Sequence, residues 1–318
     1  MNPKRNPASG YLPLDVDLLL PDITKPFQVY ILLGDQYLPY LTAGTLLTEP
    51  IRRRLRKTGI RTLYIHDRDK AVLRRYLDQN LKAILQEPSL PLETKSRVIY
   101  DSCLSQIENL WEAPSTKLIE NGKQVFRLTV DYMLDLSRHG VQHMIRMISY
   151  DQSVYTHSVN VGLLGTVLAK EALGGSDPDL HEIGYAMFLH DIGKTKIDYS
   201  ILSKPGRLSD SEWEQMRRHP ELGYQILCEE GHMSPAAAIT TLQHHERFDG
   251  KGYPGNLPGS EIDPLGRICN LVDSFDALLA TRPYKPAFPP FKALQIIKDD
   301  VEDPLGWEIF EKFVGLLR

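Results

Sequence analysis

Histidine and aspartate side chains recur along this chain at nearly equal intervals. The steps are 33 residues from His157 to His190, 28 from Asp191 to His219, 25 from His219 to His244 and 28 from His245 to Asp273. A helix, a turn and a returning helix take about that many residues in a helical bundle. Each step could therefore return one ligand-type side chain to the same level. The spacing predicts a helical domain with a metal site built from inward side chains on facing helices.

The residues next to these ligands support the same interpretation. Lys194 follows His190 by four residues and Asp191 by three, so the three would share one face of a helix. A lysine on that face suits an anionic substrate lying over a metal. The adjacent His244 and His245 would point about 100° apart within a helix, so both reach one cluster most easily where a helix ends. The glycine-rich stretch FDGKGYPG that follows them predicts such an end.

Each of these residues also has a purely structural interpretation. His157 could be a capped or core histidine, His219 a helix-end residue before a proline, and His190 with Asp191 a hydrogen-bonded core pair. Asp273 lies in an otherwise apolar helical stretch, so it needs a partner or a metal. Their joint recurrence favours the metal site. We interpret the remaining histidines as structural or surface residues: His66, His139, His143, His181 and His232.

Imidazole and carboxylate ligands without thiolate suit iron, manganese, zinc, nickel or cobalt. Seven such side chains are too many for one ion, and a carboxylate such as Asp191 can bridge two. Two metals about 3.5–4 Å apart hold a bridging hydroxide and steady both oxygens of an in-line displacement at phosphorus. Lys194 would neutralise charge on the phosphoryl oxygens. The residues therefore predict metal-assisted hydrolysis of a phosphate ester.

The composition excludes several other classes of protein. The chain has 318 residues and a formal net charge of −4, so electrostatic capture of nucleic acid over a wide surface is not expected, although a local basic pocket could exist. The longest mostly apolar stretch, 159–169, is shorter than the roughly 18 residues of a membrane-spanning helix. The N-terminus has no apolar signal region, and the three cysteines are far apart. We expect a cytoplasmic protein without a membrane span or a nucleic-acid partner.

The N-terminal part differs in pattern from the rest. Residues 1–20 resemble a loose leader, and 26–66 predict a hairpin around Gly34-Asp35, a short helix in EPIRRRLRKTGI and a returning strand in RTLYIH. The arginine run could contact a nucleotide or a partner, but charge runs usually form a solvated helix face. From Asp69 onward the pattern is mostly helical. Periodicity predicts helices at 97–113, 115–137, 153–173, 179–190, 209–228, 234–246, 261–281 and 291–317.

Residues 157–285 resemble the HD-GYP family, a branch of the HD-domain phosphohydrolases. The resemblance rests on HDIGK (190–194), ILSKPGRLSDSEWEQMRRHPELG (201–223), HHERFDGKGYPG (244–255), DSFDAL (273–278) and TRPYKPA (281–287). It implies a mainly α fold: an all-helical HD-type metal-binding bundle behind a small α+β module. The implied divisions are 1–90 as a regulatory module, 91–145 as a helical connector and 146–318 as the catalytic domain. Family members are typically bacterial phosphodiesterases that hydrolyse cyclic di-GMP to pGpG, and often on to GMP.

The resemblance also implies roles for single residues. One divalent metal would be held by His157, His190, Asp191 and Asp273, and the second by Asp191, His219, His244 and His245. Iron or manganese is favoured, with nickel, cobalt or zinc as alternatives. Lys194 would contact the scissile phosphate. The remaining positions implied to shape or contact the substrate site are Gly252, Tyr253, Pro254, Arg282 and Lys285.

One position departs from the pattern of some relatives, which bind a third metal through a glutamate one helical turn before the first histidine. Ser153 stands there in this chain, so we expect two metals, and the second hydrolysis to GMP stays open. Two alternative functions also stay open. One is a catalytically weak cyclic di-GMP receptor or protein-interaction module, and the other is an HD phosphohydrolase for another nucleotide. The N-terminal module could dimerise the protein or bind signalling partners.

Overall fold

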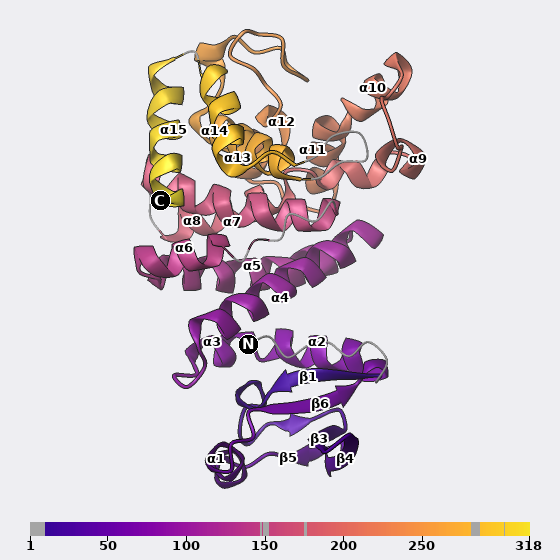
Figure 1. Ribbon diagram of the computed structural model, residues 1–318. Coiled ribbons are helices and arrows are strands. Elements are labelled where there is room, and N and C mark those ends of the chain that lie inside the picture. The colour runs from indigo at the N-terminus through magenta and orange to yellow at the C-terminus, as the bar shows by residue number, and fades with distance from the viewer. Residues whose placement is uncertain (1–9, 147, 149–152, 175–176, 281–286, 302) are drawn as a thin grey trace. The chain divides into compact units, whose positions relative to one another are not determined.

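The computed structural model describes residues 10–146, 148, 153–174, 177–280, 287–301 and 303–318 (Figure 1). The chain divides into two compact units, 1–102 and 103–318, and the division falls within helix α4 (Leu92–Glu112). Strands occur among the described residues of the first unit, and the second is helical. The predicted fold class, a helical domain behind a small α+β module, is confirmed.

The first unit contains a four-stranded antiparallel sheet with the strand order β1-β6-β3-β4. Its strands are β1 (Tyr11–Asp15), β3 (Val29–Leu33), β4 (Gln36–Leu41) and β6 (Thr62–His66), and β2 (Thr24–Lys25) pairs with β5 (Thr45–Leu46). The predicted hairpin is β3–β4. It turns at Gly34, whose φ of 60° is readily adopted by glycine. The predicted returning strand is β6.

The expectation of a loose leader over 1–20 is wrong for residues 11–20. Strand β1 pairs with β6 along its whole length, with Leu14 opposite Leu63. A short 3₁₀ turn, η1 (Val16–Leu18), follows, and the side chains of Leu14, Val16 and Leu19 are buried. The five-residue strand contains a proline and is too short to give a clear alternation, so only its pairing with β6 reveals it. Residues 1–9 lie outside the described part of the chain.

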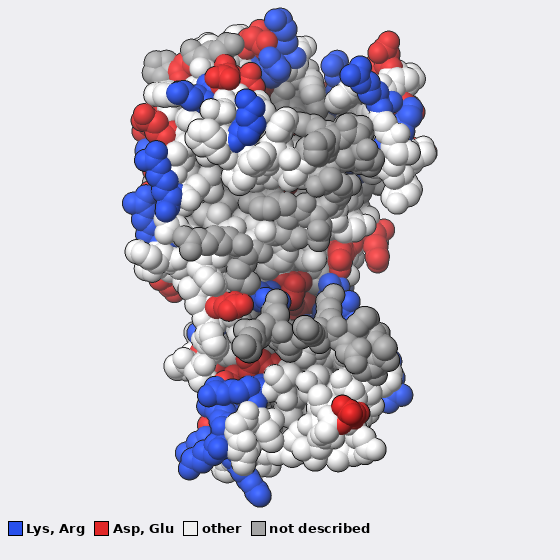
Figure 2. All heavy atoms as spheres, in the orientation of Figure 1, with Lys and Arg blue, Asp and Glu red and all other residues white. Residues whose placement is uncertain are grey.

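The arginine run is only partly a solvated helix face. It lies on α1 (Glu49–Lys57), where lysine and arginine side chains gather in Figure 2. Arg53 and Arg54 are exposed. Arg52, however, is only 4% exposed, and its guanidinium lies 2.7 Å from Glu49 and 3.2 Å from Glu87. A buried cation requires carboxylate partners. Because one of the partners of Arg52 is Glu87, which lies outside α1, this ion pair holds α1 to the rest of its unit.

Helices form at every predicted period, but two of the periods are each divided into two helices, and short helices also form at Arg138–Arg146 and Tyr199–Leu202, where none was predicted. The period 209–228 is two helices, α10 (Asp210–Met216) and α11 (His219–Glu229), and 291–317 is also two, α14 (Pro290–Asp299) and α15 (Pro304–Leu317). Each second helix has a proline in its first turn, a position that starts a helix rather than continuing one. The other helices are α2 (Lys70–Gln79), α3 (Leu81–Gln86), α5 (Thr116–Asp135), α6 (Arg138–Arg146), α7 (Val154–Leu173), α8 (Asp177–Leu189), α9 (Tyr199–Leu202), α12 (Pro235–Gln243) and α13 (Pro264–Leu279).

Helix α7 forms the centre of the second unit. Its residues from Ser158 to Ala169 are all buried, and it packs against α8, α13 and α15 (Figure 1). A helix that is mostly apolar on every side lies inside a core. Its position fixes that of His157 in its first turn, and it aligns α8 and α13, from which other ligand-type side chains come.

Candidate metal centre

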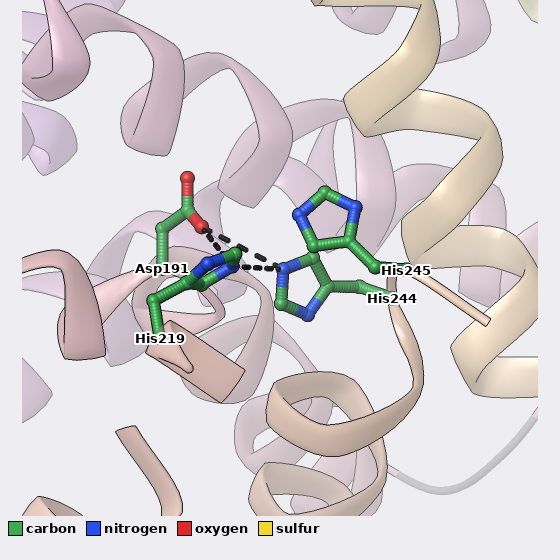
Figure 3. Close-up of side chains that lie close together, drawn as sticks. All are labelled: Asp191, His219, His244 and His245. Atoms are coloured by element: carbon green, nitrogen blue, oxygen red, sulfur yellow. Dashed lines mark hydrogen bonds and ion pairs between the residues drawn. The ribbon is translucent and has the colours of Figure 1, made fainter. Parts of the chain in front are cut away.

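The structure brings together all seven side chains that the spacing selects. They form two groups: Asp191, His219, His244 and His245 in one, and His157, His190 and Asp273 in the other. Within each group the ligand atoms lie within 4.8 Å of one another, and Figure 3 shows the first group. Most come from helix ends. His190 and Asp191 directly follow α8, His219 begins α11, and His244 directly follows α12.

Asp191 lies between the two groups and faces both. Its Oδ1 is 3.2 Å from Nε2 of His219 and 3.6 Å from Nε2 of His244 (Figure 3). Its Oδ2 is 3.3 Å from Nε2 of His190 and 3.5 Å from Nε2 of His157. One oxygen directed at each group is the geometry in which a carboxylate could bridge two cations.

Three of the histidine rings are fixed in one tautomer. Each Nδ1 faces a backbone carbonyl three or four residues earlier, at 2.9 Å in His190, 2.8 Å in His219 and 2.8 Å in His244. A carbonyl only accepts, so Nδ1 carries the proton and donates. Each Nε2 therefore presents a lone pair to the centre, as in metal-ligating histidines.

These lone pairs require a positive partner. Nε2 of His219 and Nε2 of His244 lie 3.1 Å apart, and neither can donate to the other. In the described part of the chain, Nε2 of His190 and Oδ1 of Asp191 are buried without a hydrogen-bond partner. About 3 Å is the separation of adjacent ligands that lie about 2.1 Å from one ion at right angles. The donor set therefore fits a divalent metal, and burial lowers the pKa of His219 to about 4, which keeps that ring neutral at pH 7.

A second aspartate, which the spacing argument did not assign, orients His157. Nδ1 of His157 donates to Oδ2 of Asp276 at 2.7 Å, and the other oxygen accepts from Asn160 at 2.7 Å. This leaves Nε2 of His157 directed at Asp273, 3.0 Å away. Burial alone would lower the pKa of His157, but its hydrogen bonds to the two aspartates raise it to about 10. The sequence contained a signal for this role, because Asp276 follows Asp273 by one turn on a helix that is otherwise mostly apolar.

Lys194 reaches Asp191, although not from an α-helix as expected. It lies on the 3₁₀ turn η3 (Ile192–Lys196), and its Nζ is 2.5 Å from Oδ2 of Asp191. Residues i and i+3 eclipse in a 3₁₀ helix, so this pair still meets. His190 precedes the turn and does not share that face. Burial alone would raise the pKa of Asp191, but the charge of the Lys194 ammonium holds it well below its usual range.

Tyr253 covers the outer side of His245. The two rings stack with centroids 4.7 Å apart, and the peptide bond from Tyr253 to Pro254 is cis. Burial, followed by the charges of Asp191 and Asp273, raises the pKa of the Tyr253 hydroxyl, so it stays protonated. The tyrosine thus shields one metal-ligand candidate from water.

Hydrogen bonds to Glu246 hold the loop that carries Tyr253, and the spacing argument did not select this residue. Glu246 is 3% exposed, and its carboxylate accepts from the backbone N–H of Gly255 at 2.6 Å and of Leu257 at 3.0 Å. A Cβ on Gly252 would lie 2.4 Å from the Cα of Glu246. Gly252 therefore permits close backbone packing, which is a structural role.

The other expected positions are not part of the described centre. Arg282 and Lys285 lie outside the described residues. Ser153 is the N-cap of α7, where its hydroxyl accepts from the N–H of Tyr155 at 3.1 Å. A cavity of about 520 Å³ adjoins the centre at His245 and Tyr253 and extends toward α13, α14 and α15.

The part of the chain that forms this centre is similar to known proteins. A family model described as HD domain matches residues 143–305. The chain is 37% identical over 175 residues to cyclic di-GMP phosphodiesterase PA4108 of Pseudomonas aeruginosa, covering 54% of this chain and 42% of that protein. It is 38% identical over 173 residues to 3′3′-cGAMP-specific phosphodiesterase 3 of Vibrio cholerae, covering 52% of this chain and 37% of that protein. The chain thus spans less than half the length of these two relatives.

One solved structure resembles almost the whole chain in fold. It is described as Bd1817, an HDGYP protein from Bdellovibrio bacteriovorus, and it aligns with a TM-score of 0.65 over 96% of this chain and 99% of its own, at 20% identity. Among the residues described for the present chain, none of the helices combines the length and apolar character needed to span a bilayer.

Proposed function

Because this chain belongs to the HD-domain family and carries the HD-GYP motifs within it, we propose that it is a metal-dependent phosphodiesterase that hydrolyses cyclic di-GMP to pGpG. The observation that carries the proposal is the convergence of five imidazoles and two carboxylates on one centre, with the Nε2 lone pairs of three fixed rings facing inward. A relative named as a cyclic di-GMP phosphodiesterase supports the substrate class.

We propose two divalent ions, one for each group of ligands, with Asp191 bridging them. His157, His190 and Asp273 would complete one site, and His219, His244 and His245 the other. Iron and manganese suit a mixed histidine and carboxylate site, and nickel, cobalt or zinc are the alternatives. Ions bound there would polarise the phosphoryl group and lower the pKa of a water molecule.

The protein side chains would position the substrate. The Nζ of Lys194 is within reach of a phosphoryl oxygen beside Asp191, because its side chain remains 18% exposed. Tyr253 and Pro254 would form the lip of the site, and Gly252 permits that loop to pack. Arg282 and Lys285 are proposed contacts of the cyclic dinucleotide.

The domain roles are proposals of the same kind. Residues 146–318 would be the catalytic domain, 91–145 a connector and 1–90 a regulatory module that could dimerise the protein or bind signalling partners. The cytoplasm remains the expected location.

Another cyclic dinucleotide is the second candidate substrate. A relative of nearly equal identity is named as specific for 3′3′-cGAMP, and the ligand residues do not themselves distinguish bases. A receptor without turnover is disfavoured because all seven ligand side chains are present and converge.

The first experiment combines metal content with turnover. The protein is purified without a chelating tag, its metals are counted, and cyclic di-GMP or 3′3′-cGAMP is added with Mn²⁺ or Fe²⁺ before the products are separated. We expect about two metals per chain and pGpG as the product. Two metals with bound dinucleotide and no product would replace the enzyme with a receptor, and formation of GMP would show that a third metal is dispensable.

The variant Asp191→Ala tests the bridging role. It should lose bound metal and all measurable turnover, because each of its oxygens faces one group of ligands. His139→Ala, an exposed histidine on α6, is the matched control and should behave as the parent protein. Turnover that survives in Asp191→Ala would contradict the two-metal mechanism.

A further inference from the structure

A row of stacked side chains, in which a guanidinium lies between two aromatic rings, leads from α10 to the metal centre. Trp213 lies in α10, and Arg217 caps that helix four residues later. The guanidinium carbon of Arg217 is 5.6 Å from the ring centroid of Trp213 and 5.7 Å from that of Tyr253. Tyr253 in turn stacks on His245. Arg217 is therefore separated from a metal-ligand candidate by a single ring.

Arg217 differs in charge balance from other basic side chains that line the same cavity. Arg247 lies 3.0 Å from Asp249, and Arg267 lies 2.6 Å from Asp303. Within the described residues, the exposed guanidinium of Arg217 has neither an ion pair nor a hydrogen bond. A guanidinium has five N–H donors, so this one is available to a ligand.

The space beside Arg217 is large enough for part of a nucleotide. The cavity of about 520 Å³ falls within the range of about 300–1,000 Å³ for small-molecule sites. Ile262, Leu271 and Ile297 form part of its apolar wall, and Trp213, 44% exposed, stands at its edge. Since His245 lines the cavity too, a ligand bound at the metals could extend into it.

We propose that Trp213 and Arg217 form a subsite for one of the two guanine bases of the cyclic dinucleotide. The proposal rests on the function proposed above and adds a determinant of base specificity. The indole offers a face on which a base can stack. The guanidinium can donate two parallel hydrogen bonds to O6 and N7 of guanine. Adenine presents an amino group in place of O6, so Arg217 would reject it.

The test uses hydrolysis of bis(p-nitrophenyl) phosphate by the metal-loaded full chain, with cyclic di-GMP and cyclic di-AMP as competing ligands. Arg217→Ala should raise the inhibition constant of cyclic di-GMP by about tenfold or more, and change that of cyclic di-AMP by less than about threefold. Arg217→Lys should not restore binding, because an ammonium lacks the planar pair of donors. Trp213→Ala should weaken both ligands, since stacking does not depend on the base.

The control is Arg218→Ala, an exposed neighbour that does not line the cavity and should leave both constants unchanged. All four variants should keep the metal content of the parent, which shows an intact metal centre, and Arg218→Ala should also hydrolyse bis(p-nitrophenyl) phosphate alone at the parent rate. Equal weakening of both dinucleotides in Arg217→Ala would overturn the guanine assignment, because it would show a contact with phosphate. Unchanged constants would overturn the subsite altogether.

Failure of the subsite and failure of the proposed function give different results. Inhibition by cyclic di-GMP that depends on Arg217, without formation of pGpG, would keep the subsite and reject the activity. Formation of pGpG at the parent rate and KM in Arg217→Ala would keep the activity and reject the subsite. If bis(p-nitrophenyl) phosphate is not hydrolysed, calorimetric dissociation constants of the two dinucleotides give the same comparison.

Discussion

At the scale of single residues, the centre depends on which ring nitrogen of each histidine faces inward. Backbone carbonyls hold the Nδ1 protons of His190, His219 and His244, and Asp276 holds that of His157. The partners outside the centre therefore determine the lone pairs inside it. Lys194 completes this arrangement by placing a cation against the shared carboxylate of Asp191.

Lys194→Ala should retain the metals but reduce kcat on cyclic di-GMP by about 10²–10³-fold, the usual effect of removing one donor to developing charge. Metal analysis and steady-state rates check this prediction. Lys196→Ala, an exposed lysine on the same 3₁₀ turn, is the control. Loss of metal in Lys194→Ala would show that the lysine supports the site itself instead of the substrate.

Asp276→Asn tests a positioning residue. The amide removes the charge that orients His157, so the affinity for metal should fall by about 10–100-fold while the protein stays folded. Metal titration followed by thermal unfolding measures both quantities. Asp299→Asn, an exposed aspartate at the end of α14, is the matched control. An unchanged metal affinity would restrict Asp276 to a structural role.

At the scale of elements, close backbone contacts decide where the ligands lie. The turn η3 touches α11 so closely that a Cβ on Gly193 would lie 1.9 Å from the carbonyl oxygen of His219 and 2.4 Å from the backbone nitrogen of Gly223. This contact places Asp191, just before η3, beside His219 at the start of α11. The break between α10 and α11 also helps to place His219, because it makes His219 the first residue of α11. In a continuous helix over 209–228, His219 would lie in the middle.

Gly193→Ala should separate η3 from α11. Overpacking of this kind costs about 1–3 kcal/mol of the free energy of unfolding, and metal should be lost first from the group that contains His219. Thermal unfolding and metal content measure the effect. In Gly315→Ala the new Cβ would meet only Nη2 of Arg138, at 3.6 Å, so this control should be neutral or stabilising. Normal stability and metal content in Gly193→Ala would contradict the contact.

At the scale of the whole molecule, the buried histidines make the stability of the metal-free protein depend on pH in two windows. The pKa of His219 is lowered to about 4, so between about pH 6.5 and 4 the unfolded chain binds more protons, and stability falls with acid by up to about 3 kcal/mol. The pKa of His157 is raised to about 10, so between about pH 6.5 and 10 the folded chain binds more protons, and stability falls with alkali.

The Tm of the metal-free protein should therefore be highest near pH 6.5 and decrease on either side, down to about pH 4 and up to about pH 8. Above pH 8 the buried Lys25, whose pKa is lowered to about 8 by burial, contributes in the opposite direction. Bound metal should remove the alkaline decrease, because His157 as a ligand carries no proton at Nε2. Calorimetric scans from pH 4 to 10, with and without Mn²⁺, measure both effects. A Tm that rises steadily from pH 6.5 to 8 without metal would contradict the role assigned to His157.

The sequence alone determined the helical class of the second unit, and it was enough to select the seven side chains that the structure brings together. Both depend only on the order of residues along the chain, because helical periodicity and the number of residues in a helix, a turn and a returning helix can be counted in the sequence. The hairpin at Gly34 was predictable for the same reason.

Only the tertiary structure decided the features that depend on contacts between distant residues. These are the pairing of β1 with β6, the burial of Arg52 and the roles of Asp276 and Glu246. The 3₁₀ turn at Lys194 depends equally on the approach of η3 to α11. Spacing selects residues that can reach one level of a bundle, but the direction of a lone pair or a carboxylate is set by the neighbours that packing brings to it.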